Sequence, residues 1–157
     1  ELVNNHFVVK NTFDQNEYRD PQVIEEPKFS YEIYDSDKKK ILVIDDEVDL
    51  CLSAQRRLEA NNYRVYVANS GEEGLKMVRQ YRPNVIILDI MMPKMDGYEV
   101  CRYLKMDPLT SSIPIIILTA LEHDDAAKKA LSMGADGYLV KPFETESLLF
   151  TINEFLK

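Results

Sequence analysis

The chain has 157 residues, the size of one domain of about 100–150 residues together with an extension. Hydrophobic residues make up 45% of it and charged residues 29%, which is typical of a globular protein and excludes a disordered or fibrous chain. The formal net charge of -8 argues against direct binding of nucleic acid or of an anionic membrane. No apolar run approaches the ~18–20 residues of a membrane span. We therefore expect a cytoplasmic protein.

Residues 1–39 differ in composition from the rest of the chain. They are rich in Asn, Asp, Glu and Tyr, are interrupted by Pro21 and Pro27, and have no long helical period. We expect a linker, an arm or the end of a preceding domain, although a flexible tail accounts equally well for this composition. A regular pattern begins at Lys40, so the predicted folded domain covers residues 40–157.

Short apolar runs rich in β-branched residues predict the strands of a sheet. Four of them, at 41–44, 85–88, 115–118 and 138–140, are continuous, which is typical of parallel strands buried on both faces. A fifth segment, 64–67, alternates between polar and apolar residues and predicts an edge strand.

Apolar residues at helical spacing lie between and after these strands. The five predicted stripes are Val48, Cys51, Leu52 and Leu58; Leu75 and Val78; Val100, Cys101 and Leu104; Ala127, Ala130 and Leu131; and Leu148, Ile152, Phe155 and Leu156. The two cysteines fall within these stripes, so we expect buried free thiols rather than a disulfide.

Local signals at the helix ends agree with this assignment. Ser70 with Glu73 and Asp96 with Glu99 have the spacing of capping boxes, and Gly134 stands where a left-handed helix cap is expected. Strict alternation of strands and helices predicts a doubly wound α/β fold with a five-stranded parallel sheet.

The polar residues that follow the strands are the candidate functional residues. In a sheet of this kind, ligands bind at the carboxyl ends of the strands. Asp45 and Asp46 follow the first strand, Asp89 the third, Thr119 the fourth and Lys141 the fifth. Each of them alone is most simply a turn or cap residue. As a set at one edge of the sheet they are far more specific.

The chemistry of this set favours phosphoryl transfer. Three carboxylates in one cleft repel one another, and Mg²⁺ with oxygen ligands relieves that repulsion. Lys141 adds positive charge, and the Thr119 hydroxyl can donate to a phosphate oxygen. One carboxylate could then attack phosphorus and form an acyl phosphate, and Asp89 on the central strand is best placed to do so.

Four segments carry a resemblance to a known family. Residues 41–47 (ILVIDDE), 85–97 (VIILDIMMPKMDG), 117–120 (ILTA) and 137–143 (GYLVKPF) together resemble the receiver domains of two-component response regulators, of the chemotaxis-regulator type. The resemblance extends over essentially all of residues 40–157. It implies a flavodoxin-like receiver fold with strand order 2-1-3-4-5.

The resemblance also implies a role for each site residue. Asp89 would be the phosphoacceptor, and Thr119 and Lys141 would bind the phosphoryl oxygens. Thr119 and Tyr138 would form the conformational switch, with an ordinary strand aromatic as the alternative role for Tyr138. Mg²⁺ would be held by Asp45, Asp46, Asp89 and the backbone carbonyl of Met91. The bond before Pro142 is expected to be cis.

The implied function is a phosphorylation switch rather than an enzyme in the usual sense. A receiver catalyses only its own phosphotransfer and dephosphorylation. The implied phosphodonor is a sensor histidine kinase or a phosphotransfer protein. Phosphate on Asp89 would alter binding of an effector or output domain on the face formed by helix 4, strand 5 and helix 5. The chain could be a stand-alone regulator, the receiver of a hybrid kinase or a piece of a larger regulator.

Other functions on similar sheets fit the sequence less well. A phosphatase of the haloacid-dehalogenase type needs a second Asp two positions after the nucleophile, where this chain has Met91. No glycine-rich loop follows the first strand, which argues against a dinucleotide-binding fold. A docking or dimerisation module that acts without phosphorylation remains as the alternative.

Overall fold

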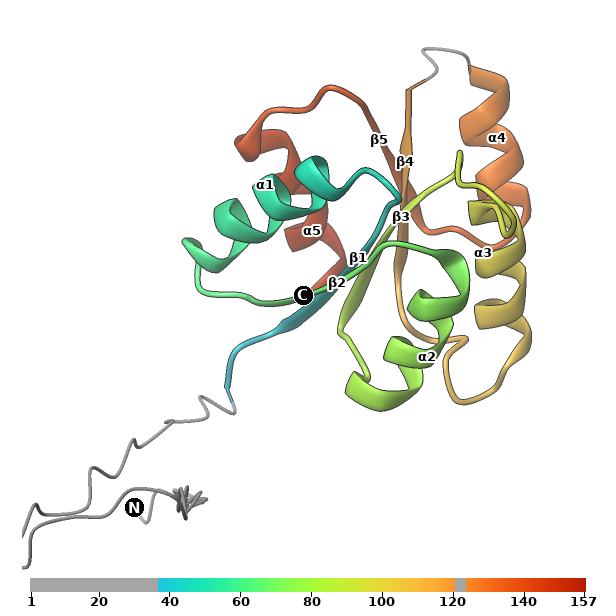
Figure 1. Ribbon diagram of the computed structural model, residues 1–157, viewed down its shortest axis with the longest axis horizontal. Helices are drawn as coiled ribbons and strands as arrows, with labels where there is room; N and C mark the ends of the chain where they lie inside the picture. Colours follow the sequence, from blue (N-terminus) through green and yellow to red (C-terminus); the bar gives the residue numbers. More distant parts are fainter. Residues whose placement is uncertain (1–36, 121–123) are drawn as a thin grey trace, which may run out of the picture. The chain divides into compact units, whose positions relative to one another are not determined.

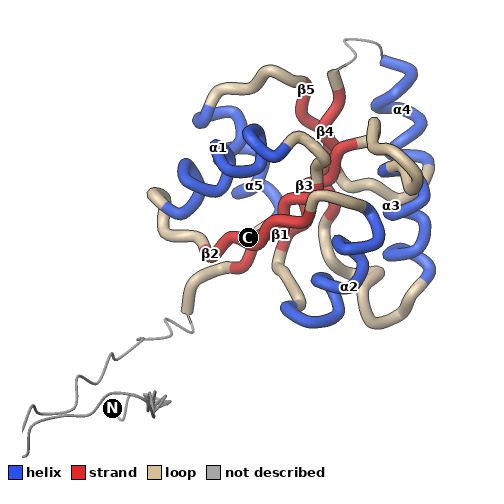
Figure 2. Tube along the Cα trace, viewed as in Figure 1, coloured by secondary structure: helices blue, strands red, loops and turns tan. Residues whose placement is uncertain are grey.

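The computed structural model describes residues 37–120 and 124–157. In these residues strands and helices alternate strictly along the chain, as predicted (Figures 1 and 2). The strands are β1 (Lys40–Ile44), β2 (Arg64–Ala68), β3 (Val85–Asp89), β4 (Ile115–Thr119) and β5 (Gly137–Val140). The helices are α1 (Val48–Glu59), α2 (Gly71–Tyr81), α3 (Gly97–Met106), α4 (Asp124–Ser132) and α5 (Thr145–Phe155).

The strands form one parallel sheet in the order β2-β1-β3-β4-β5, which confirms the predicted fold class and strand order. Every residue of β3 and β4 is buried, as their continuous apolar runs indicated. β2 is partly exposed and is the edge strand predicted from its alternation. The expectation that the apolar run of β5 is buried on both faces was wrong, because β5 is the other edge strand and leaves Tyr138 47% exposed.

Two apolar clusters cover the two faces of the sheet, because successive strand residues point to opposite sides. On one face, Ile41 and Val43 of β1 pack with residues of α1 and α5. On the other, Leu42 and Ile44 pack with residues of α2, α3 and α4. The cysteines are free and buried, Cys51 in the first cluster and the other in the second. Figure 1 shows the same layering of helices about the sheet.

The helix starts are fixed by side chains that accept hydrogen bonds from the first turn. Asp96 and Glu99 form the predicted reciprocal capping box at the start of α3. Ser70 caps α2, since its hydroxyl accepts from the Glu73 N–H at 3.2 Å. The second half of that predicted box is wrong, because the Glu73 carboxylate accepts from the backbone N–H of Asn69 instead.

Some residues assigned to the buried helical stripes are exposed. Val48 and Leu52 are 54% and 43% exposed, and Leu131 is 44% exposed. Leu52 and Leu131 each come one residue after a buried position. One residue corresponds to a rotation of about 100° around the helix axis, which turns these side chains away from the buried face. Val48 is the first residue of α1. None of the helices within the described residues has the length and apolar character required to cross a membrane.

The predicted extension over residues 1–39 lies outside the described residues except for its last three positions. Gly134, two residues after the end of α4, has the expected positive φ of 101°, so this turn uses a backbone conformation in which a side chain is disfavoured.

Candidate functional site

Four strand ends bring the predicted residues to one edge of the sheet. Asp45 directly follows β1, Asp89 ends β3, Thr119 ends β4 and Lys141 directly follows β5. The carboxyl ends of parallel strands meet at the same edge, and the register holds Asp89 level with Leu118. The structure therefore places the candidate side chains on a single rim.

Three carboxylates form the acidic part of this rim. Asp45, Asp46 and Asp89 each offer a carboxylate oxygen, and these oxygens all lie within 4.8 Å of one another. Asp45 and Asp89 are buried, whereas Asp46 is exposed. Carboxylate oxygens are the ligands that Mg²⁺ prefers, and an open side leaves room for its waters. The donor set therefore fits Mg²⁺.

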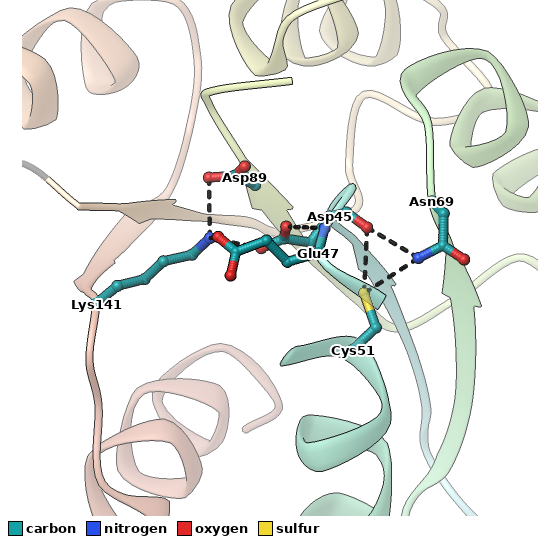
Figure 3. Close-up of polar contacts among 6 residues, drawn as sticks. All are labelled: Asp45, Glu47, Cys51, Asn69, Asp89 and Lys141. Carbon is teal, nitrogen blue, oxygen red and sulfur yellow. Dashed lines mark hydrogen bonds and ion pairs between the residues drawn. The ribbon is translucent and has the colours of Figure 1, made fainter. Parts of the chain in front are cut away.

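Lys141 brings positive charge into the same cluster (Figure 3). Its Nζ donates to Oδ2 of Asp45 at 2.7 Å and lies 3.3 Å from Oδ1 of Asp89. The Glu47 carboxylate is 3.4 Å away on the exposed side. Burial acts to lower the pKa of Lys141, but the hydrogen bond to Asp45 and the charges of the three carboxylates raise it above its ordinary value. The ammonium group is therefore charged at neutral pH.

The carboxyl group of Asp89 has a raised pKa. Burial, followed by the charge of Asp45, raises this pKa to about 6, although Lys141 and a hydrogen bond from the Met91 N–H act in the opposite direction. At neutral pH most Asp89 side chains are ionised, so this residue is available as a nucleophile.

Asp45 is held from several directions. Its Oδ1 accepts from the Glu47 N–H at 2.9 Å, while its backbone carbonyl accepts from Asn69 Nδ2 at 3.0 Å and from Cys51 Sγ at 3.2 Å. Asn69, Cys51 and Glu47 had no predicted role in the site. Of these three, Asn69 could have been found from the pairing of the first two strands. Ile44 lies opposite Ala68, so the residues that follow them, Asp45 and Asn69, are neighbours.

Thr119 and Tyr138 lie on adjacent strands and on the same face of the sheet. Tyr138 is opposite Ile117, two residues before Thr119, and residues two apart on a strand share a face. Thr119 is buried, and its backbone carbonyl accepts from the Lys141 N–H at 2.7 Å. The arrangement permits a movement of Thr119 to affect the space beside Tyr138.

The remaining predicted residues lie in the loops at this rim. Met91 is 69% exposed and lies two residues after Asp89. The role of its backbone carbonyl as a metal ligand remains a prediction. The Lys141–Pro142 peptide bond is cis.

Comparison with known proteins assigns the domain. A family model described as the response regulator receiver domain matches residues 41–153. The probable transcriptional regulator ycf27 of Cyanophora paradoxa is 44% identical over 120 residues, which are 76% of this chain and 49% of the relative. The alkaline phosphatase synthesis transcriptional regulatory protein PhoP of Bacillus subtilis is 40% identical over 119 residues, 76% of this chain and 49% of the relative. The chain thus spans about half the length of the curated relatives it matches.

Solved structures agree in fold. The chemotaxis protein CheY4 of Vibrio cholerae matches with a TM-score of 0.73 and 33% identity, covering 76% of this chain and 99% of that protein. The signal receiver domain of a signal transduction histidine kinase from Syntrophus aciditrophicus matches with a TM-score of 0.70 and 32% identity, covering 75% and 89% of the two chains.

Proposed function

Because this chain belongs to the response regulator receiver family, we propose that it is a switch in which Asp89 accepts a phosphoryl group and thereby changes partner binding. Receiver domains are signalling domains rather than classical enzymes, and phosphorylation and Mg²⁺ binding at an acidic pocket are general for the family. The roles of individual residues, the partners and the output of this particular chain are proposals.

The approach of Lys141 to both buried carboxylates carries the proposal. Its Nζ lies 2.7 Å from Asp45 and 3.3 Å from Asp89, so positive charge already stands beside the intended nucleophile. A structural ion pair needs only one carboxylate. A lysine shared by two buried carboxylates, with a third nearby, leaves the cluster net negative, which suits a site that binds a divalent cation together with a phosphoryl group.

In the proposed reaction, an oxygen of the ionised Asp89 carboxylate attacks the phosphorus of a phosphohistidine. The P–N bond breaks as the new P–O bond forms, and the released imidazole nitrogen takes a proton from water. Lys141 and the Thr119 hydroxyl bind the phosphoryl oxygens. When bound by Asp45, Asp46, Asp89 and the Met91 carbonyl, Mg²⁺ supplies positive charge that offsets the carboxylates and the phosphoryl oxygens.

We propose that Thr119 and Tyr138 convert this local event into a change of surface. Binding to the phosphoryl group draws Thr119 inward and opens space beside it, into which Tyr138 turns. Tyr138 is 47% exposed and shares its face with Thr119, which supports an outward starting position. Thr119 and Tyr138 thus have two arrangements, and the charge of the phosphoryl group shifts the equilibrium between them.

The proposed output face is formed by α4, β5 and α5. A hollow on this face is lined by apolar side chains that include Leu131, Tyr138 and Phe150, with Asp136 and Glu154 among its polar residues. Exposed apolar groups of this kind are typical of a surface that binds another protein.

The phosphodonor and the output remain proposals. We infer a sensor histidine kinase or a phosphotransfer protein as donor, since relatives of this chain are response regulators. Two relatives are named as transcriptional regulators, and this chain matches only about half the length of each. The output is an effector or an output domain, and we infer that residues 1–39 form a linker, an arm or the end of a preceding domain. The cytoplasmic location remains a prediction.

The test is phosphorylation of the purified chain by a small acyl phosphate in the presence of Mg²⁺. Intact-mass measurement should find one added phosphoryl group, and site mapping should place it on Asp89. A chelator or the Asp89→Asn substitution should abolish labelling. Asp125→Asn, which changes an exposed aspartate in α4, is the matched control and should label normally. Labelling that persists in Asp89→Asn would contradict the proposal.

A further inference from the structure

Asn69 lies beside the acidic cluster although it belongs to a different strand connection. It directly follows β2, and the β1–β2 register continues to this point because the Asp45 N–H donates to the Ala68 carbonyl at 3.1 Å. The side-chain amide of Asn69 then donates through Nδ2 to the Asp45 carbonyl at 3.0 Å (Figure 3). The side chain therefore extends the β1–β2 contact by one residue beyond the sheet.

The same carbonyl oxygen has a second donor. Cys51, from the first turns of α1, places its Sγ at 3.2 Å from the Asp45 oxygen, and Asn69 Nδ2 lies 3.6 Å from that sulfur. The Cys51 thiol is the donor in this buried contact. A carbonyl has two lone pairs, and here both have a partner.

This carbonyl belongs to the peptide that joins Asp45 to Asp46. Since the peptide is planar, fixing its oxygen fixes the direction in which the chain leaves toward Asp46. The Asp45 carboxylate is held independently by the Glu47 N–H and by Lys141. Asp46 is exposed, so the orientation of its carboxylate toward the cluster depends more strongly on the backbone.

We propose that Asn69 is a positioning residue for the Mg²⁺ site, holding the peptide between Asp45 and Asp46 so that both carboxylates face the same cation. The inference rests on the metal site of the proposed function and assigns it a residue from outside the four motifs. Loss of the amide would leave the peptide freer to rotate. The cation would then have to restrict that rotation on binding, at a cost in affinity.

The role can be separated from helix capping. The contact of Asn69 with α2 runs from its backbone N–H to the Glu73 carboxylate, which a side-chain substitution leaves in place, and Ser70 supplies the cap itself. Asn61 offers a matched control. Its Nδ2 donates to the Arg57 carbonyl at 2.8 Å, the same kind of bond at an exposed position beyond the far end of α1.

The experiment is calorimetric titration of the full chain with Mg²⁺, comparing the unsubstituted protein with Asn69→Ala and Asn61→Ala. Asn69→Ala should weaken Mg²⁺ binding about three- to tenfold, the effect of one hydrogen bond to a neutral carbonyl, and Asn61→Ala should not change it. Asn69→Leu, which keeps similar bulk without the amide, should behave as Asn69→Ala. Denaturation in chelator checks that all the variants fold.

The outcomes distinguish this inference from the proposed function. Equal affinities in the unsubstituted protein and Asn69→Ala would overturn the positioning role alone, as would an equal loss in Asn61→Ala. If the unsubstituted chain binds no Mg²⁺, the metal site of the proposed function is overturned together with this inference.

Discussion

The ammonium group of Lys141 lies 2.7 Å from Oδ2 of Asp45, a residue 96 positions earlier in the chain. The Asp45 side chain is 0% exposed and that of Lys141 only 11%, so the pair is shielded from water. It ties the end of the first strand to the end of the last. The charge balance of the rim thus depends on a contact between residues that follow the first and the last strand in the chain.

Lys141→Met should therefore destabilise the metal-free protein by about 2–4 kcal/mol, because it leaves buried carboxylates without their counter-charge. Added Mg²⁺ should restore part of that loss, since the cation can neutralise the same carboxylates. Urea denaturation with chelator and with Mg²⁺ measures both effects. Lys157→Met removes an exposed ion pair with Glu154 and should cost less than about 1 kcal/mol. Equal losses in the two variants would refute the prediction.

Asp89→Asn should stabilise the metal-free protein at neutral pH. The folded-state pKa of Asp89 is about 6, above its ordinary value of 3.8, so ionisation of this group opposes folding above pH 6. The gain should be about 1–3 kcal/mol above pH 7, should shrink as the pH falls from 6 toward 4, and should vanish below about pH 3, where the carboxyl is protonated in both states. Denaturation curves in chelator across this range test the sign. A gain that grows at low pH would contradict it.

Gly97→Ala should disrupt the loop that follows Asp89, the proposed phosphoacceptor at the end of β3. A Cβ at this position would lie 2.2 Å from the backbone oxygen of Asp89 and 2.7 Å from Cα of Ile90, and backbone atoms cannot turn away. We expect a loss of about 2 kcal/mol or more, measured by denaturation, together with slower phosphorylation. At Gly137 a Cβ would meet only the ring of Phe155, at 2.9 Å, so Gly137→Ala should be milder. The reverse order would show that the Asp89 loop adapts more easily than expected.

The Tyr138→Ala variant should still accept a phosphoryl group, but the conformational response of α4 and β5 to phosphorylation should be weaker. Without the ring, the space opened by Thr119 has no side chain on β5 to fill it. Hydrogen exchange of α4 and β5 with and without phosphorylation should differ less in Tyr138→Ala than in the unsubstituted chain, while Tyr138→Phe keeps most of the difference. An unchanged response in Tyr138→Ala would leave Tyr138 as an ordinary strand aromatic.

The sheet was predictable because its central strands are continuous apolar runs, and a run such as 115–118 has few other uses in a globular domain. The run at 138–140 is also continuous and apolar, yet it lies at an edge of the sheet. Composition cannot distinguish these cases, since exposure depends on whether another strand lies beside it. Val48 fits the helical period but is exposed. An apolar stripe in the sequence does not reveal how much of the helix is covered by neighbouring elements.

Asp45, Asp46, Asp89, Thr119 and Lys141 could be predicted to share a rim because each stands directly at a strand end. The contacts that hold these residues in place were harder to predict. Asn69 and Cys51 hold Asp45 through its backbone carbonyl, and any residue type has such a carbonyl. A motif consists of side-chain identities, so it does not reveal an acceptor of this kind.

Because both cysteines are buried, their reaction with an alkylating reagent can measure how often the protein opens. Cys51 lies in the cluster under α1 and α5, and Cys101 in the cluster under α2, α3 and α4. Both thiols are buried and burial raises the pKa of each, so we expect neither to react with an alkylating reagent while its helical layer is closed. The two alkylation rates therefore report separately how often each side of the sheet becomes accessible to solvent.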